Sequence, residues 1–204
     1  MNRMSEVLEK RKEIYSLLSS LFLGDVPREF IEDLRRGSFS LSGSVDIEDG
    51  IRMMREFVMK RRDVDEAVRD VEDEYSRLIL LSHIVPLTKS EAVGDADYGR
   101  VSLEVEEKMR KMGYRLKTHS IPPDHISAQL DFIAALIDSS MKGEEDIKDS
   151  LKKQEEFLES EMITWIPEVL EELEKSAEFY RGVARFARGF LALDRNVVRE
   201  LRLW

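Results

Sequence analysis

The stretch PPDHISAQLDFIAALI, residues 122–137, carries most of the information about the fold. At about 100° per residue, the polar side chains of Ser127, Asp131 and Asp138 fall within a helical sector of about 40°. Apolar side chains cover most of the remaining circumference, and a helix with so narrow a polar face is typical of a protein interior. We therefore expect this segment to form the buried central helix of the fold.

The residues before that helix have local structural interpretations. Pro122 and Pro123 break the preceding segment, because proline restricts the backbone before it and donates no hydrogen bond. Asp124 follows where an N-cap belongs, so we expect its carboxylate to accept hydrogen bonds from the free amides of the first turn. On this interpretation Asp124 stabilises the helix, and His125 only packs.

Helical periodicity dominates the rest of the chain as well. Apolar residues recur three and four positions apart, and glycines end several of these stripes. The expected helices cover the opening segment up to Gly24 and residues 27–34, 51–60, 64–82 and 101–112, with a loop at 38–49. The sequence thus predicts an all-α fold, with one domain over residues 1–204 built as a bundle of about eight to ten helices.

A second, longer loop interrupts this pattern between His83 and Asp97. It spans about fifteen residues and contains the turn formers Pro86, Thr88, Ser90 and Gly94. A connection of that length is near the upper limit for an unstructured loop in a compact domain, and such loops are often functional.

Composition restricts the classes of function. The 204 residues include 42% hydrophobic and 36% charged side chains, and the net charge of -10 argues against a general nucleic-acid binder. An acidic protein favours a cationic or apolar partner. The absence of cysteine excludes disulfides, thiolate metal sites and cysteine nucleophiles. Few amides and many Glu, Lys and Arg residues are typical of thermophilic proteins.

Hydropathy gives an expectation about localisation. The first residues carry charges where a signal peptide would be apolar, and no run approaches the roughly 20 apolar residues of a membrane-spanning helix. We therefore expect a cytoplasmic protein without stable membrane insertion.

Charge is distributed unevenly near the end of the chain. Residues 142–178 contain thirteen acidic and five basic side chains, whereas residues 179–204 contain six arginines and two acidic side chains. The acidic segment can be interpreted as a surface for a cationic peptide or as an ordinary solvated face. The arginines that follow provide an internal complement on the second interpretation.

Catalytic patterns are weak. His119, His125 and Asp124 offer a conceivable metal site, but their spacing is not that of a helical metal pair. The adjacent carboxylates of residues 72–74 and 171–172 do not face one another on a helix and are expected at the surface. No phosphate-binding loop or nucleophile elbow occurs. We therefore expect an interaction protein with no catalytic residue, no metal and no cofactor.

Residues 122–137 resemble the signature of the TorD/DmsD/NarJ family of molybdoenzyme-maturation chaperones. The similarity extends over about residues 70–194. Further matching positions are Glu74, Tyr75, Leu78, Pro86, Ser90, Glu91, Gly113, Gln154, Phe157, Leu158, Trp165, Pro167, Phe179, Tyr180, Phe190, Leu191 and Asp194. One departure lies in the long loop, where Leu87, Thr88 and Lys89 replace the aromatic residue often found in the family.

The resemblance implies an all-helical chaperone that binds the twin-arginine signal peptide and the apo catalytic subunit of a molybdopterin oxidoreductase. Such a chaperone assists cofactor insertion and delays export until maturation is complete. The family positions implicated in peptide binding correspond to Pro123, Asp124 and His125. We expect Pro86, Ser90, Glu91 and Tyr75, which also match the family, to belong to the same peptide-binding site.

Several alternatives stay open at this point. The protein could instead be a helical dimerisation protein without a signal-peptide ligand, or a metal- or nucleotide-dependent hydrolase. The sequence does not name the client enzyme, decide whether guanine nucleotide binds or whether a homodimer forms, or show whether the loop at 84–97 contacts the peptide.

Overall fold

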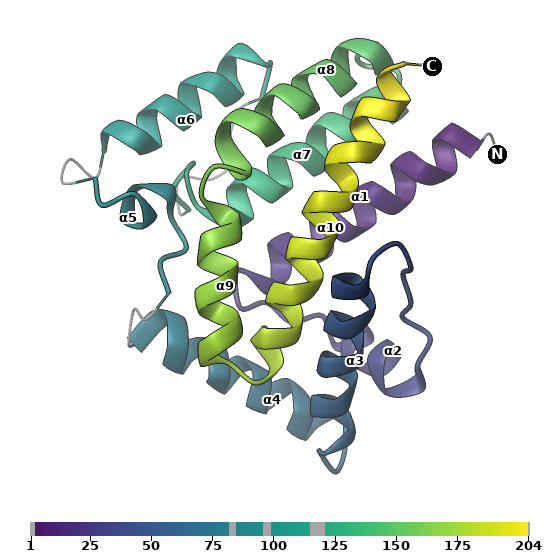
Figure 1. The fold of residues 1–204 in the computed structure, drawn as a ribbon, viewed down its shortest axis with the longest axis vertical. Helices are drawn as coiled ribbons and strands as arrows, with labels where there is room; N and C mark the ends of the chain where they lie inside the picture. The colour runs from purple at the N-terminus through teal and green to yellow at the C-terminus, as the bar shows by residue number, and fades with distance from the viewer. Residues whose placement is uncertain (1–2, 82–84, 96–98, 115–120, 204) are drawn as a thin grey trace. The chain divides into compact units, whose positions relative to one another are not determined.

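The computed structural model describes residues 3–81, 85–95, 99–114 and 121–203 (Figure 1). Its elements are α1 (Arg3–Leu21), α2 (Arg28–Arg36), α3 (Val45–Met59), α4 (Val64–Tyr75), the π-helix η1 (Ser76–Leu81), α5 (Lys89–Ala92), α6 (Arg100–Lys111), α7 (Ile126–Met141), α8 (Ile147–Phe157), the π-helix η2 (Leu158–Met162), α9 (Ile166–Ser176) and α10 (Phe179–Arg202). Within these ranges there is no β-strand, so the predicted all-α fold is confirmed.

The chain divides into two compact units. The first unit comprises residues 1–19, 87–166 and 194–204, and the second comprises residues 20–86 and 167–193. The predicted single domain over residues 1–204 stays a prediction. In the ranges described, no helix is both long enough and apolar enough to cross a membrane.

Helix α7 forms the centre of the first unit. Eleven of its sixteen residues are buried, which confirms the predicted central helix. The ring of Phe132 packs edge-on against Phe157 of α8, with 4.5 Å between the ring centroids. In addition, the hydroxyl of Ser150 donates to the carbonyl of Leu136 over 2.8 Å. Asp131, Ala135, Asp138, Ser139 and Met141 are the residues of α7 that are not fully buried, whereas Ser127 of the predicted polar sector is buried.

Helix α3 in the second unit begins earlier than predicted. Ser44 is its N-cap, and the Ser44 hydroxyl accepts from the backbone N–H of Ile47, so the expected loop at 38–49 is wrong for its last residues. Gly50 was expected to lie before the helix but lies inside it. A Cβ atom at Gly50 would lie 2.5 Å from the backbone nitrogen of Phe186 in α10. Close packing of α3 on α10 therefore requires this glycine, despite its low helix propensity.

The start of α10 depends on a carboxylate from α4. Glu74 is buried, and its carboxylate accepts hydrogen bonds from the backbone N–H groups of Glu178, Phe179 and Tyr180. These are amides that have no partner within the helix itself. The prediction that residues 72–74 all lie at the surface is therefore wrong for Glu74, although Glu72 and Asp73 are exposed.

The helix predicted at 64–82 changes geometry part-way. It is α-helical to Tyr75 and continues as the π-helix η1 from Ser76 to Leu81, while Ser82 lies outside the described residues. The side chains of Leu80 and Leu81 are exposed.

The arginines of α10 complement the acidic segment before them within each unit. In the first unit Arg195 binds Glu159 with an Nη2–Oε2 distance of 2.7 Å, and Arg199 contacts Glu155 at 3.3 Å. In the second unit Arg185 contacts Glu174 at 3.0 Å. These contacts favour the internal-complement interpretation over a free cationic-peptide surface for these three glutamates.

Candidate functional site

Two segments that the sequence singled out meet at the start of α7. The backbone N–H of Ile126 donates to the carbonyl of Leu87 over 2.8 Å, and Lys89 N–H donates to the Asp124 carbonyl over 3.0 Å. Thr88 and His125 form an isolated antiparallel bridge between these bonds. We call this junction of residues 87–91 with residues 123–126 the clasp.

The side chain of Asp124 forms its hydrogen bond across the clasp and not with the helix that follows it. Its side chain is 1% exposed, and its Oδ2 atom accepts from the backbone N–H of Ser90 over 3.0 Å. The predicted N-cap role is wrong, because α7 begins at Ile126 and His125 is its N-cap. The His125 Nδ1 atom accepts from Ser127 N–H over 3.2 Å. Asp124 lies one position too early and instead satisfies an amide in the first turn of α5.

The second oxygen of the Asp124 carboxylate is unpaired in the described part of the chain. Its Oδ1 atom is buried and has no hydrogen-bond partner there. A buried carboxylate oxygen without a donor is costly, so the clasp has unused capacity to accept a hydrogen bond.

His125 supplies an uncharged group beside that carboxylate. Burial lowers the pKa of the His125 imidazole, while the nearby charges of Asp124 and Glu91 oppose that shift. At neutral pH the ring is therefore mainly neutral, with Nδ1 accepting from Ser127.

The other candidate residues occupy different environments. Ser90 is buried, Glu91 is exposed, and Pro123 is half-buried within the first unit. Tyr75 and Pro86 belong to the second unit. His83 and His119 lie outside the described residues, as does part of the loop at 84–97.

Tyr75 has a structural role in its own unit. The Tyr75 hydroxyl donates to the carbonyl of Phe22 over 3.1 Å, and its ring lies 5.7 Å from that of Tyr180. A Cβ atom at Gly24 would lie 2.5 Å from this ring, and Gly24 also has a φ of +76°. Burial raises the pKa of the Tyr75 hydroxyl.

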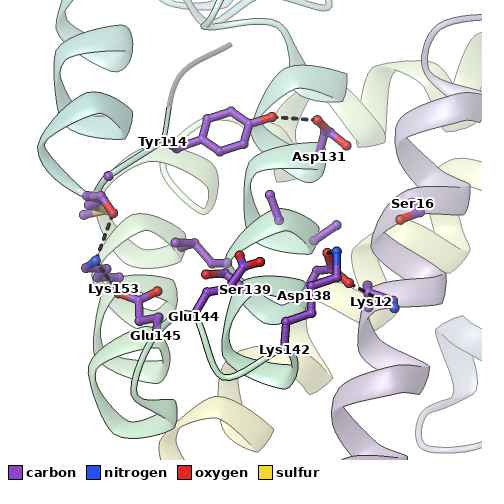
Figure 2. Close-up of a pocket in the computed structure, with 15 residues that line it drawn as sticks. Lys12, Ser16, Tyr114, Asp131, Asp138, Ser139, Lys142, Glu144, Glu145 and Lys153 are labelled. Atoms are coloured by element: carbon purple, nitrogen blue, oxygen red, sulfur yellow. Dashed lines mark hydrogen bonds and ion pairs between the residues drawn. The ribbon is translucent and has the colours of Figure 1, made fainter. Parts of the chain in front are cut away.

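A pocket of about 740 Å³ lies elsewhere in the first unit, against the polar sector of α7 (Figure 2). We call it the α7 pocket. Its lining residues come from α1, the turn after α6, α7, the loop between α7 and α8, and α8: Lys12, Ser16, Met112, Gly113, Tyr114, Asp131, Ala134, Ala135, Leu136, Asp138, Ser139, Lys142, Glu144, Glu145 and Lys153. The spacing of Asp131 and Asp138 indicated a shared polar face, but it gave no indication of a cavity.

Ion pairs occupy much of this pocket. Asp138 contacts Lys142 at 2.6 Å and Lys12 at 3.4 Å, and the pKa of the Asp138 carboxyl is lowered chiefly by the hydrogen bond from Lys142. Seven positions before Asp138 on the same helix, Asp131 accepts a hydrogen bond from the Tyr114 hydroxyl over 2.9 Å (Figure 2). The described residues contain no group of three or more His, Asp or Glu side chains arranged to hold a metal ion.

Comparison with known proteins identifies the family. The model of the nitrate reductase delta subunit family matches residues 43–171. The chain belongs to this family. It is also 27% identical to the chaperone protein TorD of Vibrio cholerae serotype O1 (strain M66-2), over 98% of this chain and 97% of the relative. The TorD chaperone of Vibrio parahaemolyticus is 22% identical over 91% of this chain and 93% of the relative. No solved structure shows significant similarity.

The match to the nitrate reductase delta subunit family confirms the resemblance. The structure also shows what Leu87, Thr88 and Lys89 contact in the loop where this chain departs from the family. Leu87 is buried. The Thr88 hydroxyl accepts from Glu91 N–H and donates to the Glu91 carboxylate over 2.8 Å, capping α5. Lys89 contacts the buried carboxylate of Glu161 at 2.7 Å. At the position where the family often has an aromatic residue, this chain therefore has Leu87, Thr88 and Lys89, which hold α5 in place.

Proposed function

We propose that this protein is a cytoplasmic maturation chaperone for a molybdopterin oxidoreductase. It binds the twin-arginine signal peptide and the apo catalytic subunit of its client, assists cofactor insertion and delays export. Membership of the nitrate reductase delta subunit family and near-full-length similarity to proteins named TorD chaperones support a chaperone rather than an enzyme.

The observation that carries peptide binding is the buried Oδ1 atom of Asp124, which has no hydrogen-bond partner among the described residues and lies in the segment that resembles the family signature. A guanidinium group is a suitable donor, because it forms short charge-assisted hydrogen bonds to carboxylates. Glu91 adds an exposed carboxylate within the same clasp. The neutral imidazole of His125 does not oppose the approach of a cation.

Access to Asp124 requires a local rearrangement. The carboxylate is almost completely covered, and Ser90 N–H already occupies one oxygen. In the proposed mechanism, α5 moves away from α7, and the peptide guanidinium replaces the Ser90 bond while also satisfying Oδ1. The short length of α5 favours such a movement, since a helix of four residues has little internal stability.

Calorimetric titration tests this proposal. The ligands are a synthetic twin-arginine signal peptide and a matched peptide in which both arginines are alanine. We expect tighter binding of the arginine peptide and weaker binding as salt rises. Asp124→Asn should reduce this affinity, because it removes the charge while keeping one acceptor oxygen. Equal affinities for the two peptides would contradict the electrostatic mechanism.

Purification of the tagged protein from its native host tests the identity of the client. We expect an apo molybdopterin oxidoreductase subunit to accompany the wild-type protein. If the protein purifies only with copies of itself and binds no signal peptide, the proposal is wrong and a dimerisation protein is the better description.

A further inference from the structure

The α7 pocket has its lysines already engaged. Lys142 contacts Asp138 at 2.6 Å, and Lys12 contacts Glu9 at 2.9 Å as well as Asp138. Lys153 donates to the carbonyl of Met112 over 2.9 Å and also pairs with Glu145. An anionic ligand would therefore have to displace existing ion pairs at each of these lysines.

Asp131 is different, because its carboxylate is oriented but not neutralised. Its Oδ2 atom accepts from the Tyr114 hydroxyl over 2.9 Å, and no Lys or Arg side chain of the described ranges forms an ion pair with it. The Tyr114 ring packs edge-on against Phe132, with 5.2 Å between centroids. The side chain of Asp131 is exposed, so it presents an open acceptor edge to a ligand.

The remaining wall suits the stem of a long side chain. Met112, Ala134, Ala135 and Leu136 line the same pocket as Asp131. Apolar and small residues next to a carboxylate match a side chain with an aliphatic stem and a cationic end. The volume of about 740 Å³ is within the range of clefts that enclose a drug-sized ligand, which is large enough for an arginine side chain.

We propose that the α7 pocket binds an arginine side chain of a client polypeptide. Asp131 accepts two hydrogen bonds from the guanidinium group, and Tyr114 is a positioning residue that holds the carboxylate. Arginine is preferred over lysine, because its planar group matches both oxygens of a carboxylate. The inference rests on the proposed function for the source of the arginine, but its residues are distinct from those of the clasp.

Nuclear magnetic resonance titration of the full-length protein tests the pocket. The probe is the tetrapeptide acetyl-Ala-Arg-Arg-Ala-amide, with acetyl-Ala-Lys-Lys-Ala-amide as the comparison ligand. We expect the arginine probe to shift the amide signals of Ala135 and Ser139 and the side-chain carboxyl carbon signal of Asp131. The lysine probe should bind more weakly.

Matched variants separate recognition from general charge effects. Asp131→Asn should lower the affinity for the arginine probe about fivefold, which is the loss expected for one exposed ion pair. Tyr114→Phe should cause a smaller loss, since the ring stays but the orienting hydroxyl is removed. Glu200→Gln removes an exposed charge of the same unit outside the pocket and should leave the affinity unchanged.

Two results would overturn the pocket assignment. One is an unchanged affinity for the arginine probe in Asp131→Asn, and the other is a set of signal shifts confined to the clasp. If a full signal peptide still binds this variant normally, only the pocket inference fails. If no variant and not even the wild-type protein binds the signal peptide, the proposed function itself fails.

Discussion

The carboxylate of Asp124 accepts a hydrogen bond from the backbone N–H of Ser90, which lies 34 positions earlier in the chain, and does not cap the helix that follows Asp124. A bond of this kind joins a loop to the central helix of its unit. It also means that substitutions at Asp124 report on the attachment of α5 more than on the stability of α7.

Substitution of Asp124 should separate attachment from charge. We expect Asp124→Ala to lower the free energy of unfolding by about 1–2 kcal/mol, because Ser90 N–H loses its acceptor. Asp124→Asn keeps an oxygen that can accept this bond and should cost less. Urea denaturation measures both values, and hydrogen exchange at the Ser90 amide should accelerate in the alanine variant alone. Equal exchange in both variants would contradict the assigned bond.

Removal of the Glu74 carboxylate should destabilise the second unit. Glu74→Ala leaves three amides at the start of α10 without their acceptor. We expect a loss of about 2 kcal/mol or more in the free energy of unfolding. The control is Glu72→Ala, which removes an exposed carboxylate from the same helix and should change stability by less than about 0.5 kcal/mol. Similar losses in the two variants would exclude the capping role.

The approach of α3 to α10 predicts strong sensitivity at Gly50. Gly50→Ala places a methyl group 2.5 Å from the Phe186 nitrogen, so the helices must separate. The expected cost is about 2 kcal/mol, visible as a lower melting temperature. Gly99→Ala is a suitable control, because a Cβ atom there meets nothing within 4 Å. An unchanged melting temperature for Gly50→Ala would show that the helices are less closely packed than described.

The imidazole of His125 should make stability depend on pH. Burial lowers its pKa in the folded protein, so the unfolded chain binds the proton more readily. The His125 contribution is therefore complete above the unfolded value of about 6.5 and decreases as pH falls below it, by at most about 1.4 kcal/mol per pH unit. Denaturation at pH 7.5 and at pH 5.5 measures the free energy of unfolding at each pH. Between these two pH values, we expect this free energy to decrease less in His125→Asn, which keeps a capping side chain, than in the wild-type protein. Identical losses would disprove this contribution.

Local patterns predicted the parts of the structure that depend on neighbours in sequence. The narrow polar sector of Ser127, Asp131 and Asp138 correctly indicated the buried α7, because helical periodicity and burial are directly related. Residues with distant partners were predicted poorly. Glu74 bonds to residues more than 100 positions away, and the helical position of Gly50 depends on α10.

The candidate site was predicted in part for the same reason. The resemblance correctly indicated the family, and Ser90, Asp124 and His125 do lie together in the clasp. The partner of Asp124 could not be predicted, because capping preferences describe only the helix that follows. The α7 pocket also escaped prediction, since its walls come from four separate segments.

The clasp has a consequence for variation in length among relatives. It joins residues 87–91 to residues 123–126, so the chain between them, which includes α6, is closed into a loop at this junction. The entropic contribution to the free energy of closing such a loop rises slowly, by about 0.6 kcal/mol for each doubling of the loop length. Insertions at exposed positions such as Gly99 should therefore be tolerated without disturbing the start of α7. The length of the chain between the two segments of the clasp can therefore change in evolution while the clasp itself stays the same.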